Sequence, residues 1–264
     1  MTNEQIKQLL LGLEETDTDF SVTMTGKSSR QVNGLYKPDS HEILLHNKNF
    51  TNENALVYTA IHEYTHHLLC VADGKCAHSR AKAHNTMFWA KMDDLLEKAV
   101  SQGVYSRQRS ENLTGLIEEA KQIDQEIANL RRKLGKLLTE IQKTSRDEGV
   151  RFEDVLSHDI KMQKSTAEKC FGASLIEQDG IGQDMQDALS KTAGKNPLVR
   201  ESAQKAVEDG KTVEQVKREI QGFSDRHKGE GAKEKLEKEK TRLEKTISAL
   251  QERLSYVCET IESM

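Results

Sequence analysis

The sequence predicts an α+β domain with a short antiparallel sheet, followed by an all-α arm built as an antiparallel coiled coil with a helical tip. Eight of the twelve aromatic residues and seven of the nine histidines precede residue 106. Beyond that point, apolar residues recur at alternating steps of three and four, which is the repeat of a coiled coil. We therefore assign residues 1–105 to a compact domain and residues 106–264 to the arm.

The compact domain begins with a predicted helix over residues 3–13. Three β-type runs follow at residues 20–24, 31–36 and 42–46, and the turn between the last two contains Pro38. These runs predict a three-stranded, mainly antiparallel sheet.

The helix predicted after the sheet carries the motif H-E-x-x-H, with His62, Glu63 and His66 at its fixed positions. Residues four apart lie one turn above each other, so both imidazoles can reach one cation. Neutral imidazole is a preferred zinc ligand, and Glu63 can take a proton from water at the ion. We therefore predict that His62 and His66 bind zinc and that Glu63 is the general base.

A surface helix rich in His and Glu would match the same motif by accident. Against that interpretation, Val57, Ile61 and Leu68 fall at helical spacing and give this helix a separate apolar face. Thr51 is its expected N-cap, and Glu53 suits the positive end of the helix dipole. The pattern therefore favours a packed helix that presents the motif to a cleft.

A catalytic zinc site normally has three protein ligands and leaves a fourth position open. The best candidate for the third is His84, which lies at the start of another amphipathic helix. Glu97 and Asp93 on that helix, and His78 in the preceding loop, are alternatives. His67 is expected to face solvent or to support the ligands through hydrogen bonds.

The sequence resembles the SprT-like metallopeptidases, the family that includes Spartan. The resemblance is carried by the order and spacing of five residues: His62, Glu63, His66, His84 and Phe88. That family carries H-E-x-x-H and then H-G-x-x-F, whose His is the third ligand; here Asn85 replaces the Gly. The resemblance implies a small zincin fold, bound zinc and hydrolysis of peptide bonds. It also implies that the last strand before the metal helix is an edge that pairs with an extended substrate. The Cys-rich zinc ribbon of many members is absent here.

The arm contains two heptad seams. The first comprises Leu113, Leu116, Ala120, Ile123, Ile127, Leu130, Leu134, Leu137 and Ile141, and the second comprises Leu236, Leu243, Ile247, Leu250, Leu254, Val257 and Ile261, with Lys240 as a polar interruption. The seams span 29 and 26 residues, about 40 Å each at roughly 1.5 Å per residue. Their similar lengths favour an intramolecular hairpin with strands 108–142 and 232–262. Parallel homodimerisation is the alternative.

The tip, residues 143–231, is predicted to be polar and helical. Residues 163–169 could begin the recognition helix of a DNA-binding module. Fifteen basic against seventeen acidic residues in 142–230 give no basic surface, so a small protein-binding helical cluster is supported at least as well as DNA binding. Thr212 and Gln215 are spaced as a capping box that opens a final helix.

Composition limits the remaining classes. The formal net charge of −4 gives no overall electrostatic signature of nucleic-acid or membrane binding. No apolar run is long enough to cross a membrane, and no signal peptide is recognisable. The four cysteines lack C-x-x-C spacing, which favours reduced thiols and the cytoplasm.

These observations predict a zinc-dependent endopeptidase that acts on protein substrates, as a monomer or a coiled-coil dimer. One alternative is a catalytically silent zinc-binding scaffold that works through its arm. Another is a DNA-associated protease whose helical tip binds DNA.

Overall fold

The structure is a computed structural model, and it describes residues 1–73, 83–193, 197–223 and 240. Contacts between Cα atoms divide the chain into two compact units, Met1–Glu219 and Ile220–Met264. Apart from Lys240, the second predicted seam lies outside the described residues. Within the described residues, no helix is both long and apolar enough to cross a membrane.

The sheet comprises three strands, β1 (Ser21–Met24), β2 (Gly34–Lys37) and β3 (Glu42–Leu45), in the order β1-β3-β2. β2 pairs with β3 in the predicted antiparallel sense, whereas β1 pairs with β3 in parallel. β3 is therefore central, so the expectation that the last strand forms the free edge is wrong. β2 is an edge strand instead. Strand order depends on contacts between distant residues, which a local pattern of apolar residues does not encode.

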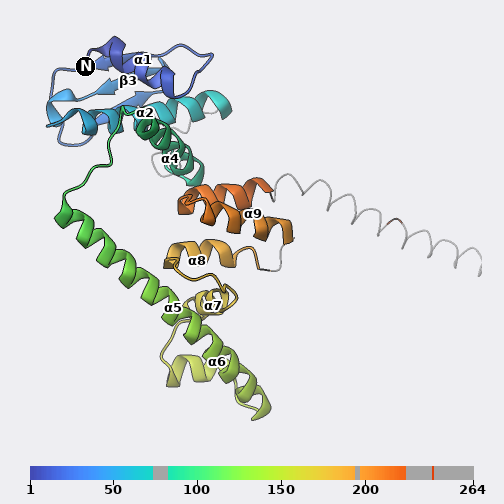
Figure 1. Cartoon of the computed structure of the whole chain (residues 1–264). Helices are drawn as coiled ribbons and strands as arrows, with labels where there is room; N and C mark the ends of the chain where they lie inside the picture. The colour runs from blue at the N-terminus through green and yellow to red at the C-terminus, as the bar shows by residue number, and fades with distance from the viewer. Residues whose placement is uncertain (74–82, 194–196, 224–239, 241–264) are drawn as a thin grey trace, which may run out of the picture. The chain divides into compact units, whose positions relative to one another are not determined.

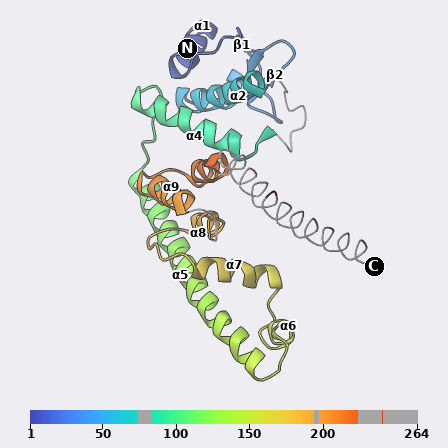
Figure 2. The same ribbon diagram turned by 90° about the vertical axis from the view of Figure 1, so that its right-hand side faces the viewer.

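Three helices complete the N-terminal region: α1 (Asn3–Leu13), α2 (Glu53–Asp73) and α4 (Thr86–Ser101). Figures 1 and 2 show α2 between the sheet and α4. A short 3-10 turn, η1 (Asn47–Asn49), leads from β3 toward α2. The side chains at the centre of the core are almost completely buried: Ile6, Leu10, Ile43, Leu45, Ile61, Tyr64, Phe88, Met92 and Leu95. Helix α2 is thus packed on both sides, as its apolar face predicts.

Helix α2 begins one residue later than expected. The side-chain oxygen of Asn52, not of Thr51, accepts a hydrogen bond of 2.8 Å from the backbone N–H of Ala55, which makes Asn52 the N-cap. Further along the helix, the Tyr64 hydroxyl donates to the backbone oxygen of Glu14 at 2.5 Å. This bond ties the middle of α2 to the end of α1.

Glu14 also connects α1 to α4, because its carboxylate forms ion pairs with Lys91 and Lys98; the Lys98 pair measures 3.0 Å. Burial raises the pKa of Glu14, but the hydrogen bonds and charges of the two lysines outweigh this effect and lower the pKa overall. Glu14 therefore contacts α2, which carries His62 and His66, and α4, which begins two residues after His84.

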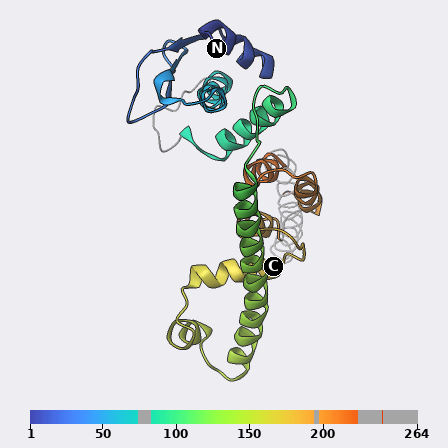
Figure 3. The same cartoon turned by 60° about the vertical axis from the view of Figure 1, so that its left-hand side comes forward.

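The arm begins with α5 (Glu111–Asp147), a helix of 37 residues. It continues through α6 (Phe152–Asp154), the π-helical turn η2 (Val155–Asp159), α7 (Lys164–Ser174), α8 (Gln183–Ser190) and α9 (Pro197–Glu208); residues 213–223 are also helical. α7 and α8 pack against the side of α5 (Figure 3). Much of the segment predicted as a tip therefore lies alongside the long helix.

One face of α5 is built for this packing. A Cβ at Gly135 would stand 1.9 Å from the backbone oxygen of Cys170, so only glycine allows α7 to approach so closely. Arg131 and Arg132 of α5 form ion pairs of 2.6 and 2.7 Å with Asp187 and Asp179.

The predicted seam of α5 lies mainly outside this contact. Its large apolar side chains are exposed at six positions: Leu113, Leu116, Ile123, Ile127, Leu130 and Leu137. Nothing within the described part of the chain buries this stripe, so its pairing with another helix stays a prediction.

The cysteines differ in part from the prediction of reduced thiols. Cys170 is a free, buried thiol, whereas Cys70 near the end of α2 is disulfide-bonded. The C-x-x-C pattern describes only cysteines three positions apart, so its absence does not exclude a disulfide between cysteines at other spacings. Cys76 and Cys258 lie outside the described residues.

Candidate metal centre

The three predicted histidine ligands meet at one point. His62 and His66 project from successive turns of α2, and His84 lies just before α4. The Nε2 atom of His84 is 3.0 Å from that of His62 and 3.1 Å from that of His66. Ligand atoms of the three residues lie within 4.8 Å of one another, and the group could hold a metal ion.

The environment keeps these imidazoles neutral, which is the form that binds metal. Burial lowers the pKa of His62 to about 4 and that of His66 to about 3, and neighbouring imidazoles add to both shifts. Burial also lowers the pKa of the more exposed His84. A single N–H on His84 can satisfy only one of its two nitrogen neighbours. The cluster is therefore better suited to a shared cation than to hydrogen bonds among its members.

Aromatic rings hold the cluster in place. The ring of Phe88 lies 4.4 Å from that of His66, and Trp89 stacks on His84 at 5.7 Å, measured between ring centroids. Phe88 is completely buried, whereas Trp89 is partly exposed. Trp89 is not predictable from the sequence as part of the site, since an exposed aromatic residue beside a motif has no distinctive spacing.

Asn85, at the position where the SprT-like motif has Gly, suits the local backbone. Asn85 is the N-cap of α4, and its side-chain oxygen accepts a hydrogen bond of 3.0 Å from the backbone N–H of Phe88. Its φ of −90° is an ordinary value for any residue. A glycine is therefore not needed after His84 in this chain.

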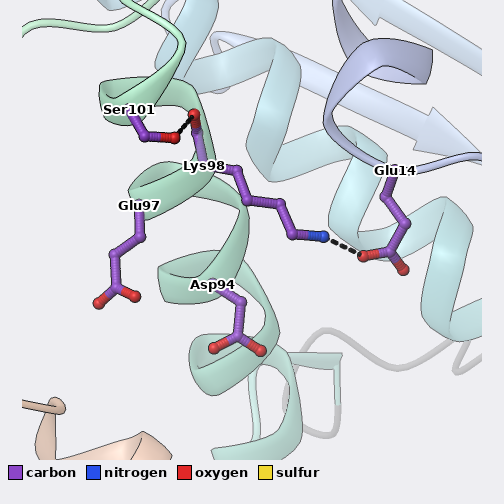
Figure 4. A pocket seen from close by; sticks show the side chains of 5 residues that line it. All are labelled: Glu14, Asp94, Glu97, Lys98 and Ser101. Atoms are coloured by element: carbon purple, nitrogen blue, oxygen red, sulfur yellow. Dashed lines mark hydrogen bonds and ion pairs between the residues drawn. The ribbon is translucent and has the colours of Figure 1, made fainter. Parts of the chain in front are cut away.

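The alternative carboxylate ligands do not join the histidine cluster. Asp93 accepts a 2.6 Å hydrogen bond from Thr212, whose side chain also caps the helix that begins at residue 213, as predicted. Glu97 lines a separate polar cavity of about 490 Å³ on α4 (Figure 4), together with Asp94 and Lys98. His78 lies outside the described residues.

Glu63 follows His62 on α2 but faces the edge strand β2. Only 6% of its surface is exposed. Burial raises the pKa of its carboxyl to about 7, against a smaller opposing effect of the hydrogen bond from the Tyr36 backbone N–H. A Cβ at Gly34 would stand 2.8 Å from Glu63 Cγ and Oε1, so the absence of a side chain lets β2 come close. An isolated Gly within a strand is a signal of such an approach that could have identified Gly34.

His67 does not point toward the other three histidines. It is completely buried, and its Nε2 lies 3.2 Å from the Thr18 backbone oxygen, while its Nδ1 lies 3.1 Å from the Tyr36 hydroxyl. Since a carbonyl only accepts, Nε2 carries the proton and Nδ1 accepts from Tyr36; His41 Nδ1 then donates to the same hydroxyl at 2.8 Å. Burial lowers the pKa of His67 to about 4, consistent with this neutral form.

Comparisons with known proteins add no identification: no family model, no curated protein and no solved structure matches the chain. The resemblance to SprT-like metallopeptidases therefore depends on the five motif residues alone.

Proposed function

We propose that this protein is a zinc-dependent endopeptidase of SprT-like type. The observation that supports this function best is that the Nε2 atoms of His62, His66 and His84 lie close together. Helix α2, which carries His62 and His66, also carries the buried Glu63. Edge strand β2, which lies against Glu63, adds support because an extended peptide can pair with a strand at the edge of a sheet.

The donor set fits zinc. Nitrogen ligands on a tetrahedron with bonds of about 2.0–2.1 Å are roughly 3.3 Å apart, close to the 3.0 and 3.1 Å that separate His84 Nε2 from the other two Nε2 atoms. Three neutral imidazoles leave one position open, as in catalytic rather than structural zinc sites. Bound zinc would lower the pKa of a water molecule to about 7 and polarise a carbonyl group.

Glu63 would take the proton from the attacking water and pass it to the leaving amine. Burial raises the pKa of its carboxyl, and a carboxyl with a raised pKa is suited both to accept and to donate a proton. The Tyr36 backbone N–H orients this carboxylate, and the neighbouring Gly34 leaves room for it.

The test is the Glu63→Gln variant, compared with wild type at matched zinc content on an unstructured protein substrate. The variant should keep zinc and fold, and its turnover should fall on the order of 10²–10⁴-fold, the usual cost of removing a general base. Equal rates in the two proteins would disprove the proposed role of Glu63. Loss of zinc in the variant would mean that Glu63 supports the metal instead.

The exposed apolar stripe of α5 supports a second candidate role, in which the arm binds another helix through a coiled-coil contact. A heptad seam cannot bury itself, and large exposed apolar patches commonly mark interaction sites. Zinc binding without cleavage of any protein would favour a scaffold over an enzyme.

A further inference from the structure

A polar hollow of about 400 Å³ lies one helical turn from the metal centre. Tyr58 and Thr59, which line it, precede His62 and Glu63 by four residues on the same faces of α2. Four residues correspond to about 6 Å along the helix axis. The hollow therefore borders the region where a bound peptide would meet the site.

Strand β2 closes the hollow on the side of Glu63. Asn33, immediately before β2, is part of its lining. At the next residue, a Cβ on Gly34 would stand 2.8 Å from both Thr59 Cγ2 and Glu63 Oε1. The edge strand thus contacts the hollow and the general base together, so a peptide that pairs with β2 would pass both.

The lining is polar but carries no charged side chain. Asn52 uses its oxygen to cap α2, and Thr59 donates to the Ala55 backbone oxygen at 3.0 Å. The amide NH₂ of Asn52 and the Tyr58 hydroxyl make no hydrogen bond within the described part of the chain. The Tyr58 ring lies 6.2 Å from that of Tyr105, between ring centroids. The hollow therefore offers free hydrogen-bonding groups and aromatic surface, and none of the side chains that line it carries a charge. The Asp93 carboxylate acts on the Tyr58 hydroxyl from outside this lining.

We propose that this hollow binds the substrate side chain next to the cleaved bond and that Asn52 and Tyr58 select an uncharged, hydrogen-bonding side chain. A charged side chain would lose solvation without gaining an ionic partner. An amide or hydroxyl side chain would instead pair with the free groups of Asn52 and Tyr58. This inference rests on the proposed peptidase function.

The experiment is to digest an unfolded protein with the full-length, zinc-loaded enzyme and to identify the cleaved bonds by mass spectrometry. At one position beside the cleaved bond, Asp, Glu, Lys and Arg should be depleted about tenfold relative to their frequency in the substrate, a modest discrimination for one pocket. Asn52→Asp should raise Lys and Arg at that position by about tenfold, because it adds one negative charge. Asp also caps a helix as well as Asn does, so α2 should fold normally.

Asn47→Asp is the matched control. Asn47 also accepts a backbone hydrogen bond, from Gly26 at 2.8 Å, but it does not line the hollow, so its profile should equal that of wild type. Identical profiles for wild type and Asn52→Asp, or cleavage without any positional preference, would overturn the inference while leaving the peptidase intact. If the zinc-loaded wild type cleaves nothing, the proposed function fails, and this inference fails with it.

Discussion

Gly34 lies against the carboxylate of Glu63, so closely that a methyl group on Gly34 would stand 2.8 Å from Glu63 Cγ and Oε1. Gly34→Ala should therefore push the carboxylate out of position while zinc remains bound. A displacement of about 1 Å can cost on the order of 10² in rate, and a loss of this size in kcat should appear in cleavage assays at matched zinc content. Gly12→Ala is the control, since nothing lies within 4 Å of its added Cβ. Unchanged kcat in Gly34→Ala would show that the contact has no influence on the base.

Alanine substitutions should separate metal ligands from neighbouring groups. His62→Ala, His66→Ala and His84→Ala should each weaken zinc binding by more than the roughly 10–100-fold that loss of an outer hydrogen-bond partner costs. Glu97→Ala should retain zinc, because Glu97 lines a different cavity. Zinc titration with a competing chelator measures these affinities. Zinc lost from Glu97→Ala but kept by His84→Ala would refute the three-histidine site.

Glu14 should make stability depend on pH. Its pKa is lowered in the folded protein, so its contribution is present above the unfolded-state pKa of about 4.3 and is lost as pH falls through the lower folded-state value. Glu14→Gln should reduce the free energy of unfolding at pH 7 by up to about 1 kcal/mol, as for other partly exposed ion pairs. Urea unfolding at several pH values should show the two proteins converging below pH of about 4. A constant difference across that range would contradict the role of the ion pairs.

Substitutions at Leu130 test the long helix. Leu130→Pro should cost about 3 kcal/mol or more, because proline removes a backbone hydrogen bond and clashes in the helix interior. It should also disturb the neighbouring Arg131–Asp187 pair. Leu130→Ala, by contrast, should change little, since Leu130 is 63% exposed. Circular dichroism and thermal unfolding measure both variants. A large loss of stability in Leu130→Ala would mean that another helix covers the stripe.

The helices and strands of this protein were easier to predict from the sequence than the contacts between them. The 3.6-residue period located α2 and α4, and the spacing from His62 to His66 placed two imidazoles together because it depends only on helix geometry. The prediction of His84 as the third ligand depended also on the resemblance to SprT-like metallopeptidases. Helical periodicity does not predict the path of the chain between His66 and His84. The convergence of His84 with the other two is a property of the fold.

Contacts across the sheet and around α5 were harder to anticipate. The pattern of residues 20–24 does not indicate whether β1 pairs with β3 in parallel or antiparallel. The approach of Gly34 to Glu63, and of Gly135 to Cys170, each depends on a missing side chain whose partner is remote in sequence. The heptad of α5 correctly indicated a long helix, but the α5 residues buried against α7 and α8 include Ala128 and Leu138, which lie outside the seam.

The buried hydrogen bonds of His67 also have a consequence for metal loading. Adjacent residues on a helix are about 100° apart around its axis. The hydrogen bonds of His67 to Thr18 and Tyr36 therefore fix the rotation of α2 about its axis, and with it the directions of His62 and His66. The metal-free protein should consequently stay folded, unlike small zinc modules that unfold without their ion. Removal of zinc with a chelator and its rebinding would then be reversible, because the three histidines would stay in place in the folded protein.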